Sequence, residues 1–119
     1  MDSKEFSEVI SEIIITKKGY DIRLLDLREL SSFADFFLIC SADSDVQVKA
    51  IADAIDKDLR KVGIKCQHKE GYVALNWVLL DYFDVVVHVF KSDSRSFYNL
   101  EKLWGDAPVT VIEDETEQG

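Results

Sequence analysis

The sequence predicts an α/β fold in which helices flank one mixed β-sheet. Two stretches, residues 3–18 and 44–62, place apolar residues at helical spacing. Short apolar runs rich in β-branched and aromatic residues lie between and after them, and such runs are typical of strands. Because the second helix falls between two groups of strands, we expect it to cross over from one strand to another.

The centre of the sheet is predicted to be a hairpin over residues 76–90, with its turn at Phe83-Asp84. Side chains alternate along a strand, so one face of this hairpin is wholly apolar, while the other carries Trp77, Asp81 and His88. Both faces need cover, and the mixed face is the first candidate for a working surface. The alternative is that Trp77 and His88 form a core pair under a helix. Phe83 lacks the backbone freedom of the usual turn residues, so we expect a strained or widened turn.

The remaining elements follow from caps and periodicity. Ser44 with Gln47 forms a capping box at the start of the second helix, and Gly19 and Gly63 end the two long helices. The predicted order is a helix at 3–18, strands at 22–27 and 35–41, a helix at 44–62, a short strand at 64–69, the hairpin, and a helix at 95–104 in which Phe97, Leu100 and Trp104 share one stripe.

Length and composition predict one domain that needs no disulfides. The chain has 119 residues, of which 47% are hydrophobic, enough for a substantial core. Its two cysteines, Cys40 and Cys66, lie in strand-like stretches, and no signal peptide or membrane-spanning run is recognisable. We therefore expect a protein of the reducing cytoplasm that does not enter membranes.

The charge balance favours a cationic protein partner. Lys and Arg total 14 against 23 Asp and Glu, for a formal charge of -9. A groove that wraps nucleic acid needs clustered cations, and no dense block of them occurs in the sequence. An acidic domain is instead attracted to basic proteins. The acidic segment 108–119 is predicted to be a flexible tail that follows a domain of residues 1–107.

Two kinds of catalytic or metal site have weak support. Cys66, His68 and His88 supply too few zinc ligands at suitable spacing. A stronger alternative is a Mg-dependent nucleotidyltransferase-like enzyme using Asp43, Asp45 and Asp81 (or Asp84). No Gly-rich loop or nearby cation is present to hold a triphosphate, however, and helix capping explains the first two aspartates equally well.

A binding surface is the simpler interpretation. Trp77, Tyr98 and Trp104 belong to residue types enriched at the energetic centres of interfaces, although such aromatics are also ordinary core residues. Glu70, Asp81 and Asp84 are placed to face cations on a partner.

Several separate blocks, in this order, resemble the ribosomal silencing factor family, also called RsfS or Iojap. The likeness covers nearly all of residues 5–107. The blocks are Ala34 to Ile39, Glu70-Gly71, Trp77 to Tyr82, Asp84 to Phe90, and the pattern that runs from Arg95 to Trp104.

The resemblance implies a single nucleotidyltransferase-like domain without enzymatic chemistry and without a cofactor or metal. Family members bind a basic large-subunit ribosomal protein at the subunit interface, number fourteen in the usual naming, and keep the small subunit from joining when nutrients are scarce. They also self-associate in isolation. The family commonly has Gly where this chain has Phe83. The matching blocks carry over seven residues: Glu70, Trp77, Asp81, Asp84, His88, Arg95 and Tyr98. Our hypothesis is that they bind the partner, the alternatives being roles in folding or self-association.

Overall fold

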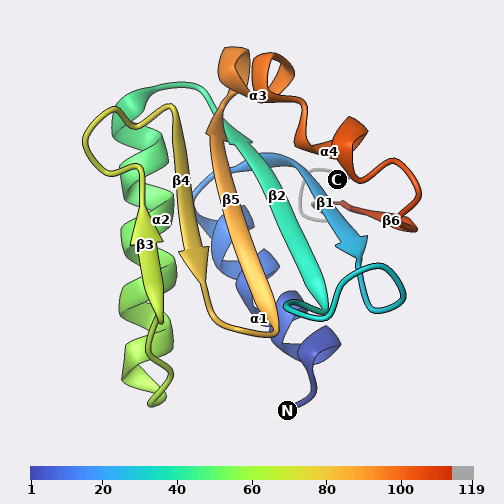
Figure 1. The fold of residues 1–119 in the computed structure, drawn as a ribbon. Helices are drawn as coiled ribbons and strands as arrows, with labels where there is room; N and C mark the ends of the chain where they lie inside the picture. The colour runs from blue at the N-terminus through green and yellow to red at the C-terminus, as the bar shows by residue number, and fades with distance from the viewer. Residues whose placement is uncertain (114–119) are drawn as a thin grey trace.

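A six-stranded mixed sheet, in the order β3-β4-β5-β2-β1-β6, runs through the molecule (Figure 1). The computed structural model describes residues 1–113. Strands β2 and β5 are parallel, and all other neighbours are antiparallel. The predicted α/β class and mixed sheet are confirmed. The elements are α1 (Ser3–Thr16), β1 (Tyr20–Asp26), β2 (Phe36–Ala42), α2 (Asp45–Lys61), β3 (His68–Glu70), β4 (Trp77–Asp81), β5 (Val85–Lys91), α3 (Ser92–Tyr98), α4 (Leu100–Leu103) and β6 (Val109–Ile112).

The central hairpin has the predicted register. Trp77 pairs with Phe90 at one end of β4 and β5, and Asp81 pairs with Val86 at the other. The expected strain in the turn is present, because Phe83 adopts φ +70°, in the left-handed region that favours glycine. The Asp84 N–H donates to the Tyr82 carbonyl at 3.0 Å, which closes a tight turn across Phe83.

Helices α1 and α2 lie side by side on one face of the sheet (Figure 1) and form the main core with it. The apolar side of the hairpin packs there, as predicted. Ser44 caps α2 by accepting from the Gln47 N–H at 3.2 Å, but the Gln47 side chain accepts from the Asp43 N–H, one residue earlier than a capping box requires. Gly63 follows the end of α2 with φ +84°. No helix within residues 1–113 has the length and apolarity to cross a membrane.

The predicted helix after the hairpin is divided in two. Asn99 adopts φ +46° between α3 and α4, a conformation that Asn tolerates better than most residues. The break rotates the following turn away from the stripe that the sequence predicted. Phe97 is consequently 82% exposed, whereas Leu100 and Trp104 pack on the sheet.

The segment predicted to be a flexible tail contributes a strand. Residues Val109–Ile112 form β6, which pairs with β1 from Ile22 to Leu25. The domain therefore extends beyond residue 107, and the tail prediction is wrong for residues 109–112. The end of the chain from residue 114 lies outside the described residues.

Candidate partner-binding surface

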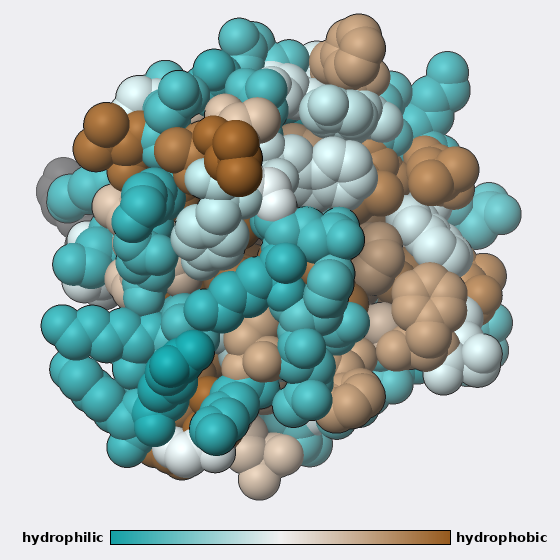
Figure 2. Space-filling view, turned by 60° about the vertical axis from the view of Figure 1, so that its left-hand side comes forward, coloured by the Kyte–Doolittle hydropathy of each residue, from teal (hydrophilic) through white to brown (hydrophobic). Residues whose placement is uncertain are grey.

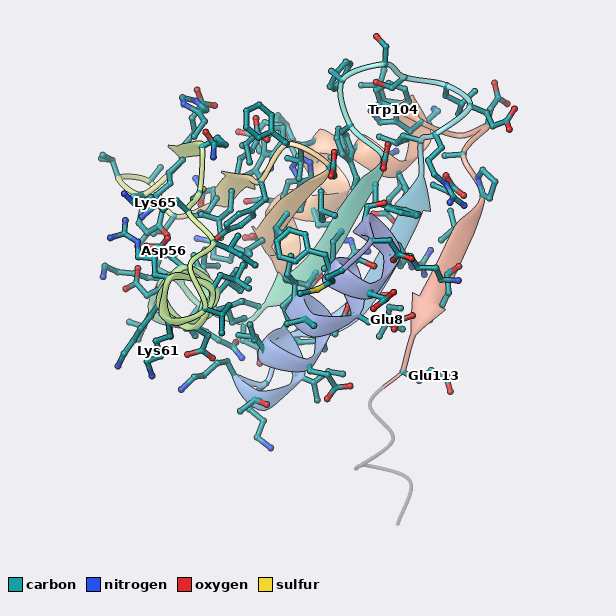
Figure 3. All side chains as sticks on the ribbon, turned by 90° about the horizontal axis from the view of Figure 1, so that it is seen from below. Glu8, Asp56, Lys61, Lys65, Trp104 and Glu113 are labelled. Atoms are coloured by element: carbon teal, nitrogen blue, oxygen red, sulfur yellow. The ribbon has the colours of Figure 1, made fainter. Side chains whose placement is uncertain are left out.

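The sheet face opposite α1 and α2 carries an unbroken row of aromatic rings, which we call the aromatic face: Phe33, Trp77, Phe97, Tyr98 and Trp104, resting on buried Phe37, His88 and Phe90. Neighbouring ring centroids lie 4.5 to 6.5 Å apart throughout the row. Figure 3 places Trp104 on the side of the sheet away from α1 and α2. Apolar side chains gather over this face, at the right of Figure 2, while hydrophilic ones cover the flank formed by α2.

Trp77 and His88 form a hydrogen-bonded pair across β4 and β5. The Trp77 Nε1–H donates to His88 Nδ1 at 3.0 Å. An imidazole that accepts at Nδ1 is neutral and carries its proton on Nε2, which here is buried without a hydrogen-bond partner among residues 1–113. Burial lowers the pKa of His88 to about 3, because the charged form is poorly solvated inside the sheet. His88 therefore stays neutral near pH 7 and orients the indole.

Trp77 and Tyr98 supply the centre of the aromatic face. Their ring centroids are 4.9 Å apart, and Trp77 also stacks on Phe90 at 5.0 Å. Trp77 is half-buried, whereas Tyr98 at the end of α3 is 48% exposed. Gly71 permits this arrangement, since its φ is +93° and a Cβ there would lie 1.9 Å from the Trp77 carbonyl oxygen.

Carboxylates border the aromatic face along β3 and β4. Glu70 lies opposite Leu79 in register, so its side chain shares the outer face with Trp77 and Asp81. Glu70 is exposed, and the half-buried Asp81 accepts a backbone N–H of the hairpin turn at 2.8 Å. Asp84 is exposed in the turn itself. This margin gives the face a negative edge suited to a cationic partner.

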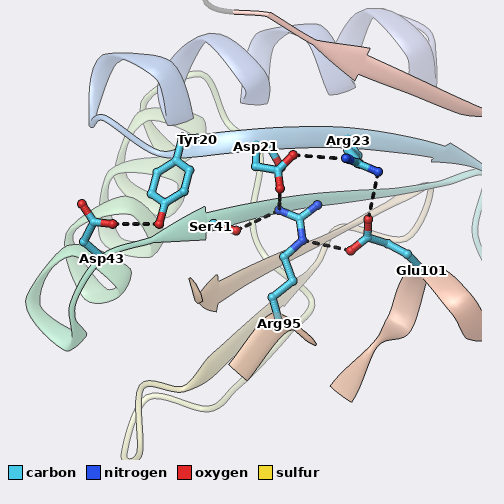
Figure 4. Close-up of polar contacts among 7 residues, drawn as sticks. All are labelled: Tyr20, Asp21, Arg23, Ser41, Asp43, Arg95 and Glu101. Carbon is cyan, nitrogen blue, oxygen red and sulfur yellow. Dashed lines mark hydrogen bonds and ion pairs between the residues drawn. The ribbon is translucent and has the colours of Figure 1, made fainter. Parts of the chain in front are cut away.

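Arg95 is buried and holds the module of α3 and α4 on the sheet. Its Nε donates to Glu101 at 2.9 Å, and its Nη1 donates to the Asp21 carbonyl at 2.5 Å and to Ser41 Oγ at 2.9 Å (Figure 4). Arg23 closes a ring of alternating charges, 3.3 Å from Asp21 and 3.5 Å from Glu101. Asp21 reaches Arg95 from a bulge in β1, where its φ is +49°.

The carboxylates of the nucleotidyltransferase alternative do not converge. Asp43 and Asp45 follow the end of β2, where Asp45 pairs with Lys91 at 3.0 Å. Asp81 instead pairs with Val86 at the opposite end of β5, about 16 Å away along the strand. The structure thus contradicts a magnesium site built from these residues.

Cys66, His68 and His88 likewise form no metal site. Within the described part of the chain, no three His, Cys, Asp or Glu side chains group together as candidate ligands. The Cys66 thiol instead donates to the His68 carbonyl at 3.1 Å, and burial raises its pKa.

Comparisons with known proteins agree on one family. The family model described as "Ribosomal silencing factor during starvation" matches residues 1–119. The ribosomal silencing factor RsfS of Bacillus subtilis is 45% identical over 113 residues, covering 95% of this chain and 96% of that protein. RsfS of Halalkalibacterium halodurans is 44% identical over 113 residues, covering 95% and 97%. The chain belongs to the ribosomal silencing factor family.

Two solved structures share this fold, and the family model and the relatives confirm the resemblance seen in the sequence. A crystal structure from Chromobacterium violaceum matches with a TM-score of 0.85 at 34% identity, covering 96% of this chain and 95% of that one. A second, from Bacillus halodurans, matches with a TM-score of 0.82 at 40% identity, covering 92% and 100%.

The seven residues assigned to partner binding occupy different environments in this silencing factor. The structure brings Trp77, His88 and Tyr98 together, with the three carboxylates at the margin or in the turn. His88 is only 2% exposed and Arg95 only 7%, so both support the surface from below. The alternative that Trp77 and His88 form a core pair holds only for His88, because Trp77 reaches the surface.

Sequence reasoning missed two exposed members of the aromatic face. Phe33 is 67% exposed and rests edge-on against Trp104. Phe97 was predicted to share one helical stripe with Leu100 and Trp104, and the break at Asn99 separates it from them. The tendency of Asn to adopt the left-handed conformation was the one feature of the sequence that could have indicated a break at Asn99.

Proposed function

We propose that this silencing factor binds the large ribosomal subunit through the aromatic face and thereby prevents the small subunit from joining. The partner is a basic ribosomal protein at the subunit interface, number fourteen in the usual naming. Occupancy alone represses translation when nutrients are limiting, so the proposal requires no catalytic step. The setting is the cytoplasm, where the ribosomes are.

The observation that carries the proposal is the exposed aromatic row with its acidic margin. Large aromatic side chains dominate the binding energy of interfaces, and Phe33, Phe97 and Tyr98 are 67%, 82% and 48% exposed. Such exposure costs solubility unless a partner covers it. The negative margin and the formal charge of -9 would steer the chain towards a basic protein. A contact of about 800 Å² on each partner is sufficient for a specific complex.

The direct test is a subunit-joining assay. Purified large subunits are preincubated with the protein, small subunits are added, and association is followed by light scattering. We expect joining to fall as the protein reaches saturation, and direct binding to the isolated ribosomal protein number fourteen. Unchanged joining at saturation would reject the proposal.

Tyr98→Ala tests the surface assigned to binding. Tyr98 is 48% exposed, so its removal leaves the main core intact, and we expect affinity for the large subunit to fall about 30-fold, as for an interface hot spot. Tyr20→Ala is the matched control, because Tyr20 is 40% exposed and its hydroxyl donates to Asp43 at 2.7 Å, away from the aromatic row. If the two variants bind with equal affinity and both keep native far-UV circular dichroism, the contact does not include Tyr98 and lies on another surface.

The same face would serve self-association. Sedimentation velocity over a range of protein concentrations measures the oligomeric state. If copies pair through the aromatic face, Tyr98→Ala shifts the protein to monomer and addition of large subunits dissociates the dimer. A dimer that persists on the subunit would use a different surface.

A further inference from the structure

We propose that the carboxyl end of α2, with the adjoining β3, forms a second contact surface of this silencing factor, which binds the phosphate backbone of ribosomal RNA. The inference rests on the proposed function, because docking on the large subunit brings the chain next to that RNA. We call this surface the basic end and define it by five residues: Lys57, Arg60, Lys61, Lys65 and Lys69.

The basic end has a positive charge in an acidic chain. Residues 56–69 carry five Lys or Arg against two Asp, whereas the whole chain has a formal charge of -9. One carboxylate serves two of the cations: Asp56 lies 3.2 Å from Arg60 Nε and 2.7 Å from Lys69 Nζ. Because Lys69 comes from β3, the fold adds a cation that helical periodicity would not place beside α2. Arg60, Lys69 and Asp56 together therefore keep one net positive charge.

The other three lysines make no ion pair within residues 1–113. Lys57 and Lys61 lie four residues apart, on neighbouring turns of the same side of α2. Asp53, which is also four residues from Lys57, is instead paired with Lys49 at 2.7 Å. Lys65 follows the helix, and Figure 3 shows Lys61 and Lys65 on the α2 side of the molecule with Asp56 between them. These ammonium groups are free to bind an external anion.

Capping of the helix explains only part of this cluster. Cations in the last turn of α2 stabilise its negative pole, which accounts for Arg60 and Lys61. Lys65 and Lys69 lie beyond the helix and receive no such benefit. A cluster of cations in which Lys57, Lys61 and Lys65 have no ion-pair partner within residues 1–113 is the electrostatic footprint expected for phosphate contacts, whose affinity comes from counterion release.

The position of the basic end allows both surfaces to act together. It lies on the hydrophilic flank in Figure 2, while the aromatic face occupies another side of the molecule. His68 and Glu70 point to the outer face of β3, and Lys69 points back towards α2, so β3 separates the two surfaces. The proposed contact is between a flat surface and a few phosphates. It does not require a groove that wraps nucleic acid, which the composition argues against.

The test compares two variants with the same change in charge. The first is Lys57→Gln, Lys61→Gln, Lys65→Gln. The control is Lys4→Gln, Lys17→Gln, Lys18→Gln, since these lysines also make no ion pair within the described residues. Affinity for purified large subunits is measured at about 50 and about 200 mM KCl, a roughly fourfold change in salt concentration. Loss of three phosphate contacts reduces the salt slope by about 2.1 to 2.7, so wild-type affinity should fall about 20- to 40-fold more than that of the first variant.

The outcomes separate the two proposals. The control should follow wild type, and all three proteins should bind the isolated ribosomal protein number fourteen equally. Equal salt slopes for wild type and the first variant overturn the RNA contact and leave the proposed function standing. Failure of the wild type to bind subunits overturns both. A photo-crosslinking amino acid that replaces Lys61 should crosslink the protein to ribosomal RNA on the large subunit, giving a product that ribonuclease digests. If it crosslinks only to ribosomal proteins, the RNA contact is also overturned.

Discussion

At the scale of single residues, the aromatic face depends on a neutral histidine. Trp77 needs an acceptor for its indole N–H, and His88 supplies one only while Nδ1 is unprotonated. Protonation would place a charge among Phe37, Trp77 and Phe90, where it has little solvation. Acid should therefore destabilise the fold through this one group before the carboxylates titrate.

The pH dependence of His88→Gln tests this. The His88 pKa is about 3 in the folded chain and near 6.5 in the unfolded chain, so between these values only the unfolded state binds the proton. The free energy of unfolding consequently falls as the pH decreases below 6.5, by about 2 kcal/mol from this group between about pH 7 and 5. Urea denaturation at both pH values should show a smaller decrease in His88→Gln. His68→Gln is the control and should retain the wild-type decrease.

The turn residue Phe83 gives a second prediction at this scale. Its φ of +70° costs about 1 to 2 kcal/mol for a residue with a Cβ, and its ring is 64% exposed, so little packing compensates. Phe83→Gly should raise the free energy of unfolding by about 1 kcal/mol in urea denaturation. Phe97→Gly makes the same chemical change in α3 without a positive φ and should lower it by about 1 kcal/mol. Shifts of the same sign would contradict the strain argument.

At the scale of elements, periodicity and caps predicted the long helices and the hairpin, because their signals are local. The hairpin register followed from alternation on either side of the turn at Phe83-Asp84, and α2 begins at the predicted Ser44 cap. The C-terminal helices were less predictable. A helical stripe does not predict that Asn99 will adopt φ +46°. The module of α3 and α4 is held in place because Arg95 of α3 donates to Asp21 and Ser41, which are distant in sequence.

Arg95→Met should therefore loosen α3 and α4 as a unit. Removing the guanidinium leaves the Asp21 carbonyl and the Ser41 and Glu101 side chains without their donor, and we expect a loss of about 2 to 4 kcal/mol in the free energy of unfolding. Near-UV circular dichroism should also change, because Trp104 follows α4 onto the sheet.

Arg28→Met is the matched control for that variant. Arg28 pairs with Asp26 at 2.7 Å, but its side chain is 54% exposed and solvent screens the pair, so the loss of stability should be much smaller than in Arg95→Met. Equal losses in the two variants would show that burial of Arg95 contributes nothing to the attachment of the module.

At the scale of the whole molecule, one sheet separates a helical face from an aromatic face, and the charges divide as well. The formal net charge of -9 describes an acidic protein, but a charge summed over the whole chain does not reveal the basic end at α2. Composition also concealed β6, because the acidic residues after it made the whole segment resemble a tail. The pairing of β6 with β1 joins residues more than 80 positions apart, and no local pattern encodes such a contact.

Truncation tests whether β6 belongs to the folding unit. A chain ending at Pro108 keeps Ala107, which is buried beneath the aromatic face, but loses β6. Strand β6 pairs with four residues of β1, and its Ile112 packs against the main core. We expect the free energy of unfolding to fall by about 2 kcal/mol, from the lost strand hydrogen bonds and apolar burial. A chain ending at Glu113 retains every described residue and is the matched control, expected to unfold like the full chain. If both truncations unfold alike, β6 adds nothing to stability, and the boundary at residue 107 that the sequence suggested is the correct one.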